Sequence, residues 1–197
     1  MKLFGFEVEL SDEVYVPRED TYLLAEVLEN EVDEEDKVLD VGTGCGILAM
    51  IAAERSREAV GVDKSEKAVQ LARKNASRND LKNVRFQESD LFAEVGGKFD
   101  LIIFNAPYLP PRKDQLKVME REQWFGGKDG TEIVRKFSRE VKDYLSERGR
   151  VLLLVSSLTG VDTTAEILEG SCLRSEVTAE RKIPWETLYV FKAVKKL

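Results

Sequence analysis

Hydrophobic and polar positions change their period repeatedly along the chain, which predicts strands separated by helices. Short apolar runs predict five successive strands, at residues 38–41, 59–63, 84–86, 100–104 and 151–155. Between them, hydrophobic residues recur every three or four positions, which predicts helices after Gly46 and over residues 65–76, 131–148 and 163–168. Two further runs, at about residues 173–181 and 188–194, predict a terminal strand pair. The alternation indicates an α/β fold with a parallel sheet.

The first 36 residues are expected to form a short hairpin and a helix, packed on a main domain of residues 37–197. Loose alternation over residues 3–16 predicts the hairpin, with its turn at Ser11-Asp12. Pro17 then opens the predicted helix, because proline is favoured in the first helical turn. The buried stripe of this helix is predicted to be Leu23, Leu24, Val27 and Leu28.

Composition and charge narrow the classes of function. The chain has 197 residues, 43% of them hydrophobic, which is enough for one substantial core. A net charge of -7 disfavours broad binding to nucleic acid and leaves only a local basic groove. No apolar run approaches the roughly 20 residues of a membrane span, so we expect a cytoplasmic protein. Two cysteines, Cys45 and Cys172, and no histidine predict neither a disulfide framework nor a metal site.

A glycine-rich loop follows the first predicted strand. Asp40 lies in that strand, Gly42, Gly44 and Gly46 come next, and an apolar helix follows. This order is typical of dinucleotide or adenosyl binding, because glycine lets the backbone approach a ligand closely. The Asp40 carboxylate would repel a diphosphate, whereas it would attract a cationic sulfonium ligand that carries an amino group. The loop therefore favours an adenosyl ligand of that kind.

Two more acidic residues follow the next two strands. Asp63 ends the second strand about 20 positions beyond the glycine loop, the spacing at which a carboxylate accepts from ribose hydroxyls. Asp90 and Leu91 follow the third strand and can offer a carboxylate for an exocyclic amine and an apolar wall for a purine. Taken alone, Asp90 is more simply a helix cap or a turn residue. As the third acid in a series after Asp40 and Asp63, it is interpreted as a ligand-binding residue.

The fourth strand ends abruptly in Asn105, Ala106, Pro107 and Tyr108. Open α/β sheets bind ligands at the carboxyl ends of their strands, so this turn is a candidate reactive centre. Pro107 favours an extended Ala106, so the Ala106 carbonyl and the Asn105 side-chain oxygen can accept two hydrogen bonds from one NH2 group. An ordinary turn after a strand is the simpler alternative. A connection of about twenty residues follows, 109–130, and its length predicts a substrate loop.

Together these motifs resemble the S-adenosylmethionine-dependent methyltransferases, whose fold is a seven-stranded Rossmann-like sheet with helices on both faces and a terminal antiparallel strand pair. Within that superfamily, the chain is most similar to the HemK-like release-factor glutamine methyltransferases, in their archaeal and eukaryotic branch. The similarity rests on residues 14–21, on the motif at Asn105, and on residues 124–130, where Trp124 and Phe125 precede two glycines. It covers nearly the whole chain.

The resemblance implies a cofactor, S-adenosylmethionine, and the residues that bind it. The methionine end would lie against the start of the first long helix and the glycine loop, the ribose against Asp63, and the adenine against Asp90 and Leu91. The implied cofactor-binding residues are Thr21, Asp40, Gly42, Gly44, Asp63, Asp90, Leu91 and Asn105. The implied catalytic residues are Asn105, Ala106, Pro107 and Tyr108.

Two departures from the family pattern bear on this interpretation. Ala106 stands where the family has its first proline, but the group implied to act there is a backbone carbonyl, which alanine also supplies. The helical N-terminal domain of the bacterial enzymes is not expected here. Its absence points to the branch whose catalytic subunit pairs with a small zinc-binding activator protein. In this fold the strand near residues 84–87 lies at the sheet edge, and we expect the activator to dock there by strand addition.

The implied reaction is methyl transfer to a glutamine amide nitrogen, in the Gly-Gly-Gln loop of a translation release factor. Asn105 and Ala106 would accept the hydrogens of that nitrogen as charge develops on it. Tyr108 would stack on the amide plane, or would simply pack beside it. Two alternatives stay open. One is an adenine amino-methyltransferase that acts on DNA or RNA through the same two acceptors, and the other is a non-catalytic cofactor-binding module.

Overall fold

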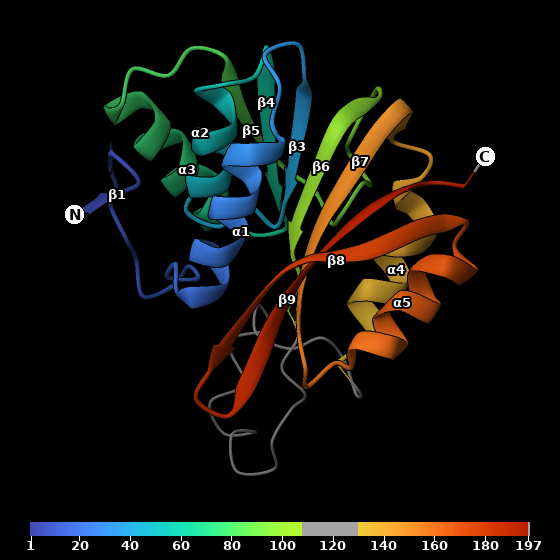
Figure 1. Cartoon of the computed structure of the whole chain (residues 1–197). Coiled ribbons are helices and arrows are strands. Elements are labelled where there is room, and N and C mark those ends of the chain that lie inside the picture. Colours follow the sequence, from blue (N-terminus) through green and yellow to red (C-terminus); the bar gives the residue numbers. More distant parts are fainter. Residues whose placement is uncertain (108–129, 197) are drawn as a thin grey trace.

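The computed structural model describes residues 1–107 and 130–196, and its main feature is a seven-stranded sheet with helices on both faces (Figure 1). The strands of this sheet are β3 (Lys37–Val41), β4 (Glu58–Asp63), β5 (Val84–Glu88), β6 (Phe99–Asn105), β7 (Leu145–Ser156), β8 (Leu173–Ile183) and β9 (Glu186–Lys195). The helices are α1 (Glu19–Glu31), α2 (Ile47–Ala53), α3 (Glu66–Arg78), α4 (Glu132–Val141) and α5 (Val161–Gly170). The predicted fold class is confirmed.

The strand order is β5-β4-β3-β6-β7-β9-β8. The first five strands of this order run parallel, and β9 lies antiparallel between β7 and β8. Parallel strands that are covered on both faces need apolar residues at consecutive positions, and residues 151–156 of β7 are all buried. The carboxyl ends of all the parallel strands therefore lie at the same edge of the sheet.

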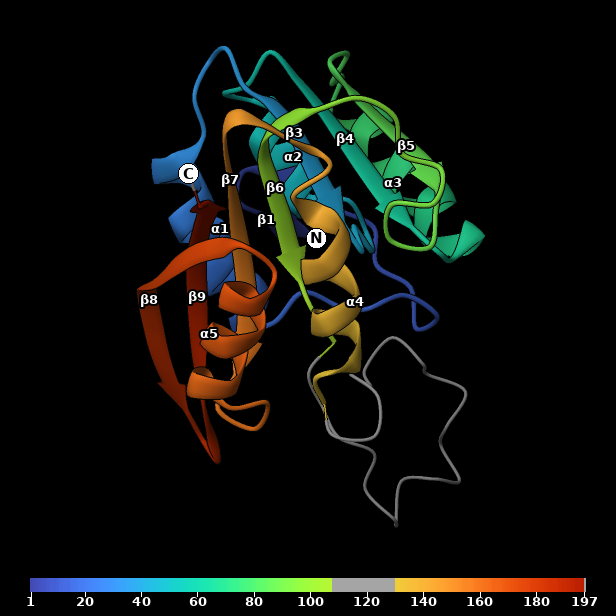
Figure 2. The same ribbon diagram turned by 90° about the vertical axis from the view of Figure 1, so that its right-hand side faces the viewer.

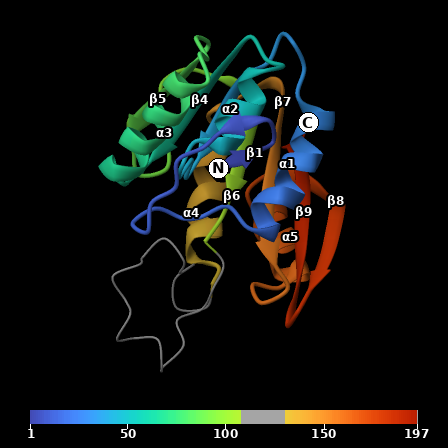
Figure 3. The same ribbon diagram turned by 90° about the vertical axis from the view of Figure 1, so that its left-hand side faces the viewer.

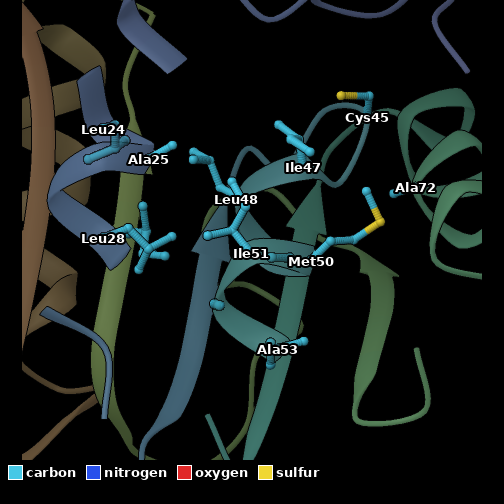
Figure 4. Packing of buried hydrophobic residues seen from close by; sticks show 14 of the residues in the cluster. Leu24, Ala25, Leu28, Cys45, Ile47, Leu48, Met50, Ile51, Ala53 and Ala72 are labelled. Atoms are coloured by element: carbon cyan, nitrogen blue, oxygen red, sulfur yellow. The ribbon is translucent and has the colours of Figure 1, made fainter. Parts of the chain in front are cut away.

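Two apolar cores fill the space between the sheet and its helices. α1, α2 and α3 cover one face, and α4 and α5 cover the other (Figures 2 and 3). All residues of α2 are buried, and Figure 4 shows Leu28 of α1 facing Leu48 and Ile51 of α2. On the opposite face, the Phe104 and Phe137 rings lie 4.7 Å apart, centroid to centroid. Both faces of β3 and β6 are thus packed against apolar side chains, which fixes the positions of Asp40 and Asn105 at the ends of these strands.

The N-terminal hairpin is shorter than predicted and turns elsewhere. β1 (Lys2–Leu3) pairs with β2 (Phe6–Glu7), so the hairpin predicted around Ser11-Asp12 was wrong, although the chain does turn there, where the Val14 amide donates to the Ser11 carbonyl at 3.2 Å. The observed turn is formed by Phe4 and Gly5, whose φ values are 50° and 88°. Two successive positive φ values are the backbone of a two-residue hairpin loop, which the alternation of hydrophobic residues did not reveal.

The segment after the hairpin is fixed to α3 by side-chain hydrogen bonds. Asn75 is fully buried, accepts from the Glu9 amide at 2.8 Å, and donates to the Glu9 carbonyl at 3.1 Å. An asparagine amide can satisfy both backbone groups of one residue, so this segment needs no partner strand. α1 begins at Glu19 with Arg18 as its N-cap residue, so Pro17 precedes the helix rather than opening it, and three of the four residues of the predicted stripe are buried. The division of the chain at residue 36 stays a prediction.

α4 is shorter than the helix that the sequence predicts. It ends at Val141, whereas Tyr144 and Leu145 were predicted to continue it. Leu145 instead begins β7 and pairs with Phe99 of β6. The Phe99 amide also donates to the Tyr144 carbonyl at 2.8 Å. Pairing with a buried strand overrides the helical spacing of these side chains, and Gly149, the predicted helix stop, lies within β7.

β5 and β8 form the two edges of the sheet, so the prediction that residues 84–87 lie at an edge is confirmed. The tip of the β8–β9 hairpin extends past the carboxyl ends of the parallel strands (Figure 1). Over residues 1–107 and 130–196, no helix is both long and apolar enough to cross a bilayer.

Candidate active site

The carboxyl ends of β3, β4 and β6 bring the predicted site residues to one edge of the sheet. Asp40 in β3 is level with Ile103 in β6, two residues before Asn105. The glycine loop leaves β3 next, and Gly42 and Gly44 have φ values of 68° and 55°. Because side chains disfavour this backbone region, glycine lets the chain turn tightly from β3 toward α2.

Asp40 is a buried carboxylate with one oxygen left for a ligand. Only 1% of the residue is exposed, and its Oδ2 accepts from the Thr43 hydroxyl at 2.6 Å. Its Oδ1 is buried and has no hydrogen-bond partner among the described residues. Burial raises the pKa of Asp40 to about 7, although the Thr43 hydrogen bond acts in the opposite direction. A buried acceptor in this state favours a ligand that carries positive charge or N–H donors.

Asp63 ends β4 and braces the glycine loop. Its Oδ2 accepts from the Gly44 amide at 3.0 Å, and its Oδ1 accepts from the Ser65 amide at 2.9 Å. Desolvation raises the pKa of Asp63, and the backbone donors Ser65 and Gly44 partly offset this effect. Each carboxylate oxygen can accept a further hydrogen bond, so ribose hydroxyls can bind beside the amides.

Asp90 and Leu91 lie after β5, at the far end of this edge. Asp90 is exposed, and its Oδ2 accepts from Lys136 Nζ at 2.8 Å. Leu91 is buried against the α4 face of the sheet and has a φ value of 52°. This strained backbone is uncommon for leucine, and such residues concentrate at ligand sites. The assignment of both residues to the adenine stays a prediction.

Asn105 is the last residue of β6, and its side-chain amide is held by Asp20 from α1. Asn105 Nδ2 donates to Asp20 Oδ2 at 3.2 Å. The nitrogen must face the carboxylate, because two oxygens would repel each other, so the amide orientation is fixed. Asn105 Oδ1 is left buried and without a hydrogen-bond partner among the described residues. Ala106 is buried beside it, whereas Tyr108 and all but the last residue of the loop predicted at 109–130 lie outside the described residues.

Asp20 is a site residue that the sequence reasoning assigned only to the helix terminus. It is 4% exposed and accepts from the Tyr15 hydroxyl at 2.5 Å and from the Thr21 amide at 2.6 Å. The Thr21 hydroxyl donates to the same carboxylate at 3.2 Å, which places this predicted cofactor residue in the Asp20 network. Helical spacing could have revealed Asp20, because it precedes the buried Leu24 by four residues and so shares its face.

The site therefore combines two unpaired buried oxygens, Asp40 Oδ1 and Asn105 Oδ1, with a braced glycine loop. Both oxygens are acceptors, so the arrangement suits a ligand with a cationic group and a second ligand with an NH2 group. In the described part of the chain, no group of three or more histidine, cysteine, aspartate or glutamate side chains is arranged to hold a metal ion.

Comparison with known sequences places the chain among methyltransferases. The family described as "Methyltransferase small domain" matches residues 19–122, which is more than half of the chain. A provisionally named protein N5-glutamine methyltransferase of Methanocaldococcus jannaschii is 41% identical over 196 residues and is covered to 98%, as is this chain. The release factor glutamine methyltransferase of Streptococcus pneumoniae is 31% identical over 80% of this chain, which spans 59% of that protein's length.

Comparison with solved structures also finds methyltransferases. The Mtq2-Trm112 complex of E. cuniculi, described as responsible for the methylation of the eRF1 translation termination factor, contains a chain with a TM-score of 0.74 and 27% identity. The match covers 94% of this chain and 99% of that one. A methyltransferase from Pyrococcus furiosus, 22% identical, has the same fold, with a TM-score of 0.76 over 99% of this chain and 91% of that chain.

Domain match, full-length sequence similarity and site geometry agree with one another. The resemblance stated from the motifs is confirmed, and the chain belongs to the methyltransferases, within the family of protein N5-glutamine methyltransferases.

Proposed function

We propose that this protein methylates the side-chain amide of a glutamine with S-adenosylmethionine as the methyl donor. When bound, this cofactor supplies an electrophilic methyl group on a positively charged sulfur. The residues fit it: Asp40 offers an unpaired buried oxygen to a cationic group, and Asp63 offers acceptors beside the Gly44 amide. Thr21, Gly42, Asp90 and Leu91 complete the proposed cofactor site.

The observation that carries the proposal is the fixed orientation of the Asn105 amide. Asp20 holds its nitrogen, so Oδ1 faces outward from the carboxylate as a preorganised acceptor at the carboxyl end of β6. An amide nitrogen is a weak nucleophile, because its lone pair is shared with the carbonyl. Asn105 Oδ1 and the Ala106 carbonyl would each accept a hydrogen bond from this NH2 group. These two bonds would stabilise the positive charge that develops on the nitrogen. As the new N–C bond formed, the methyl C–S bond would break, the electron pair would stay on sulfur as the leaving thioether, and the nitrogen would release one proton to water.

The proposed substrate is the glutamine of a Gly-Gly-Gln loop in a translation release factor. The support is the similarity to release factor glutamine methyltransferases and to the complex that methylates eRF1. A glutamine flanked by glycines extends into a narrow site with little steric hindrance. Pro107 and Tyr108 would border this entrance, with Tyr108 stacking on the amide plane.

Competition tests this assignment. Purified enzyme, with a Trm112-type partner present and absent, is offered an equimolar mixture of an eRF1-type release factor and adenine-containing DNA and RNA oligonucleotides. Mass spectrometry then locates the added methyl group. We expect it on the glutamine of the Gly-Gly-Gln loop. Methylated oligonucleotides with an unmodified release factor would replace the proposal by adenine methylation.

We further propose that a small zinc-binding activator pairs with the open edge of β5. The Asn83 carbonyl and the Ser89 amide bond to β4, so the alternate residues Val84, Phe86 and Glu88 turn their backbone groups outward. The Phe86 carbonyl accepts from the Arg73 guanidinium, with Nη2 at 2.7 Å, which a partner strand would displace. Outward-facing amides are the usual donors for strand addition.

Hydrogen exchange tests the activator site. Mixing the chain with its Trm112-type partner should protect the amides of Val84, Phe86 and Glu88, while the amides of β8, at the opposite edge, exchange as before. A complex that forms without protection of β5 would place the interface elsewhere.

A further inference from the structure

The tip of the β8–β9 hairpin carries a tryptophan whose side chain has no packing role in the described structure. Trp185 is 95% exposed, the highest exposure among the large hydrophobic residues described. Leu158, on the loop after β7, is 42% exposed. The loop after β7 is joined to the start of β9, two residues beyond Trp185, because the Ser157 amide donates to the Thr187 carbonyl at 2.8 Å and the Thr187 amide donates to Ser157 Oγ at 3.0 Å. Trp185 and Leu158 are called the hairpin-tip patch below.

The backbone at Trp185 adds a second unfavourable feature. Pro184 and Trp185 form the two-residue turn between β8 and β9, and Trp185 has a φ value of 79°. Proline followed by a residue with positive φ is a type II turn, whose second central position favours glycine or asparagine. A bulky side chain there is strained, and a large apolar surface in water gains nothing from folding. Both costs would be offset if Trp185 were buried against another molecule.

The position of the hairpin-tip patch indicates which molecule would bury Trp185. Asn105 pairs with Leu154 of β7, and Leu154 pairs with Val190 of β9. Two strand spacings are about 10 Å, and the five residues from Val190 back to Trp185 span about 17 Å. The Trp185 backbone therefore lies roughly 20 Å from Asn105 and beyond the same sheet edge. A standard interface buries about 800 Å² on each partner. Such an area is about 30 Å across and is wide enough to include both Asn105 and Trp185.

We infer that the hairpin-tip patch is a docking surface for the folded protein substrate, on the domain that carries the modified glutamine. The inference rests on the proposed function. A protein whose glutamine enters the site at Asn105 must lie over this edge, and it covers Trp185 if its surface extends about 20 Å from the glutamine. Tryptophan suits such a role, because exposed aromatic anchors provide much of the binding energy of protein interfaces. The proposed activator site on β5 lies at the opposite edge of the sheet and does not compete for the patch.

The inference separates two kinds of substrate. A seven-residue peptide centred on glutamine extends only about 10 Å to either side, too short to reach Trp185 from Asn105. An intact release factor does reach it. Trp185 should therefore matter for the protein substrate and not for the peptide.

The test uses Trp185→Gly, because glycine fits the positive φ and should leave the melting temperature unchanged or higher. With an eRF1-type release factor, the variant should raise KM about tenfold or more and leave kcat unchanged. With the seven-residue Gly-Gly-Gln peptide, kcat/KM should equal that of the wild type. Trp185→Phe should restore most of the affinity. Val177→Ala is the matched control, since Val177 is 40% exposed but lies in the body of β8.

Each outcome decides between the two claims. An unchanged KM for the release factor would refute the docking surface and leave the proposed function intact. A fall in kcat that is equal for protein and peptide would also refute it, since Trp185 would then act on the reaction centre. A wild-type enzyme that methylates neither substrate would refute the proposed function and the docking surface together.

Discussion

Asp20→Asn is the most direct test of whether Asp20 fixes the orientation of the Asn105 side-chain amide. Asp20 is buried and accepts from Tyr15, Thr21 and Asn105. The substitution keeps the size of the side chain but replaces one acceptor oxygen with an NH2 group. That group opposes either the Asn105 amide nitrogen or the Thr21 amide, so donor faces donor. If the NH2 group faces Asn105, the Asn105 amide loses its acceptor and can rotate, which turns Oδ1 away from the substrate nitrogen. If it faces Thr21, the bond to Asn105 remains but weakens, because its acceptor is no longer charged.

The expected loss follows from the strength of one charge-assisted hydrogen bond. Such bonds contribute about 1.5–3 kcal/mol, and about 1.4 kcal/mol corresponds to a tenfold change in rate. Single-turnover methylation at saturating cofactor should therefore slow by roughly 10- to 100-fold in Asp20→Asn. The affinity for S-adenosylmethionine should change much less, because Asp20 acts through Asn105 on the substrate.

Glu19→Gln is the matched control, because Glu19 is the adjacent residue of α1, undergoes the same change of charge, and is exposed. Calorimetry with the cofactor and thermal melts of both variants separate loss of positioning from loss of folding. A single-turnover rate for Asp20→Asn within twofold of the wild type would refute the positioning of Asn105 by Asp20.

Three further variants test the proposed site. Asn105→Ala should slow single turnover by about 100-fold or more, because a preorganised acceptor acts mainly as charge develops; a near wild-type rate would exclude the two-acceptor mechanism. Asp63→Ala should weaken cofactor binding by roughly 2 kcal/mol, and unchanged affinity in calorimetry would remove Asp63 from the site. Cofactor affinity should fall as pH drops below 7, because the pKa of Asp40 is raised to about 7 and only its ionised form attracts a sulfonium. Asp40→Asn should remove this dependence, and a variant that kept it would assign the titration to another group.

Local patterns predicted the central strands well, because strands that are buried on both faces consist of consecutive apolar residues. Residues 151–155 form a continuous apolar run, and such runs are stable only between two covered faces. The prediction failed where a distant partner decides the structure. Leu145 has helical spacing with Val141, but pairing with Phe99 places it in β7. The Phe4-Gly5 turn depends on backbone dihedral angles that hydrophobic spacing does not encode.

The site residues divide in the same way, into those that the neighbouring sequence predicts and those that depend on a contact with a distant residue. Asp40, Asp63 and Asn105 could be identified because each lies at or next to the last residue of an apolar strand, and the fold brings strand ends together. Helical spacing places Asp20 on the buried face of α1, but its contact with Asn105 joins residues 85 positions apart and could not be predicted from a local pattern. The hydrogen bonds of Asp20 emerge only once α1 packs beside β6.

The two edges of the sheet also bear on how the chain behaves before a partner arrives. An unpaired edge strand can pair with the same strand of another copy, which leads to aggregation. At β5, the Arg73 guanidinium occupies the outward Phe86 carbonyl and so blocks one position of that ladder. β8 has an irregular register between Val177 and Ala179 and exposes the charged residues Arg174, Glu176, Glu180 and Lys182. Both features hinder the pairing of one copy with another, and a strand that docked at β5, as proposed, would have to displace Arg73 from the Phe86 carbonyl.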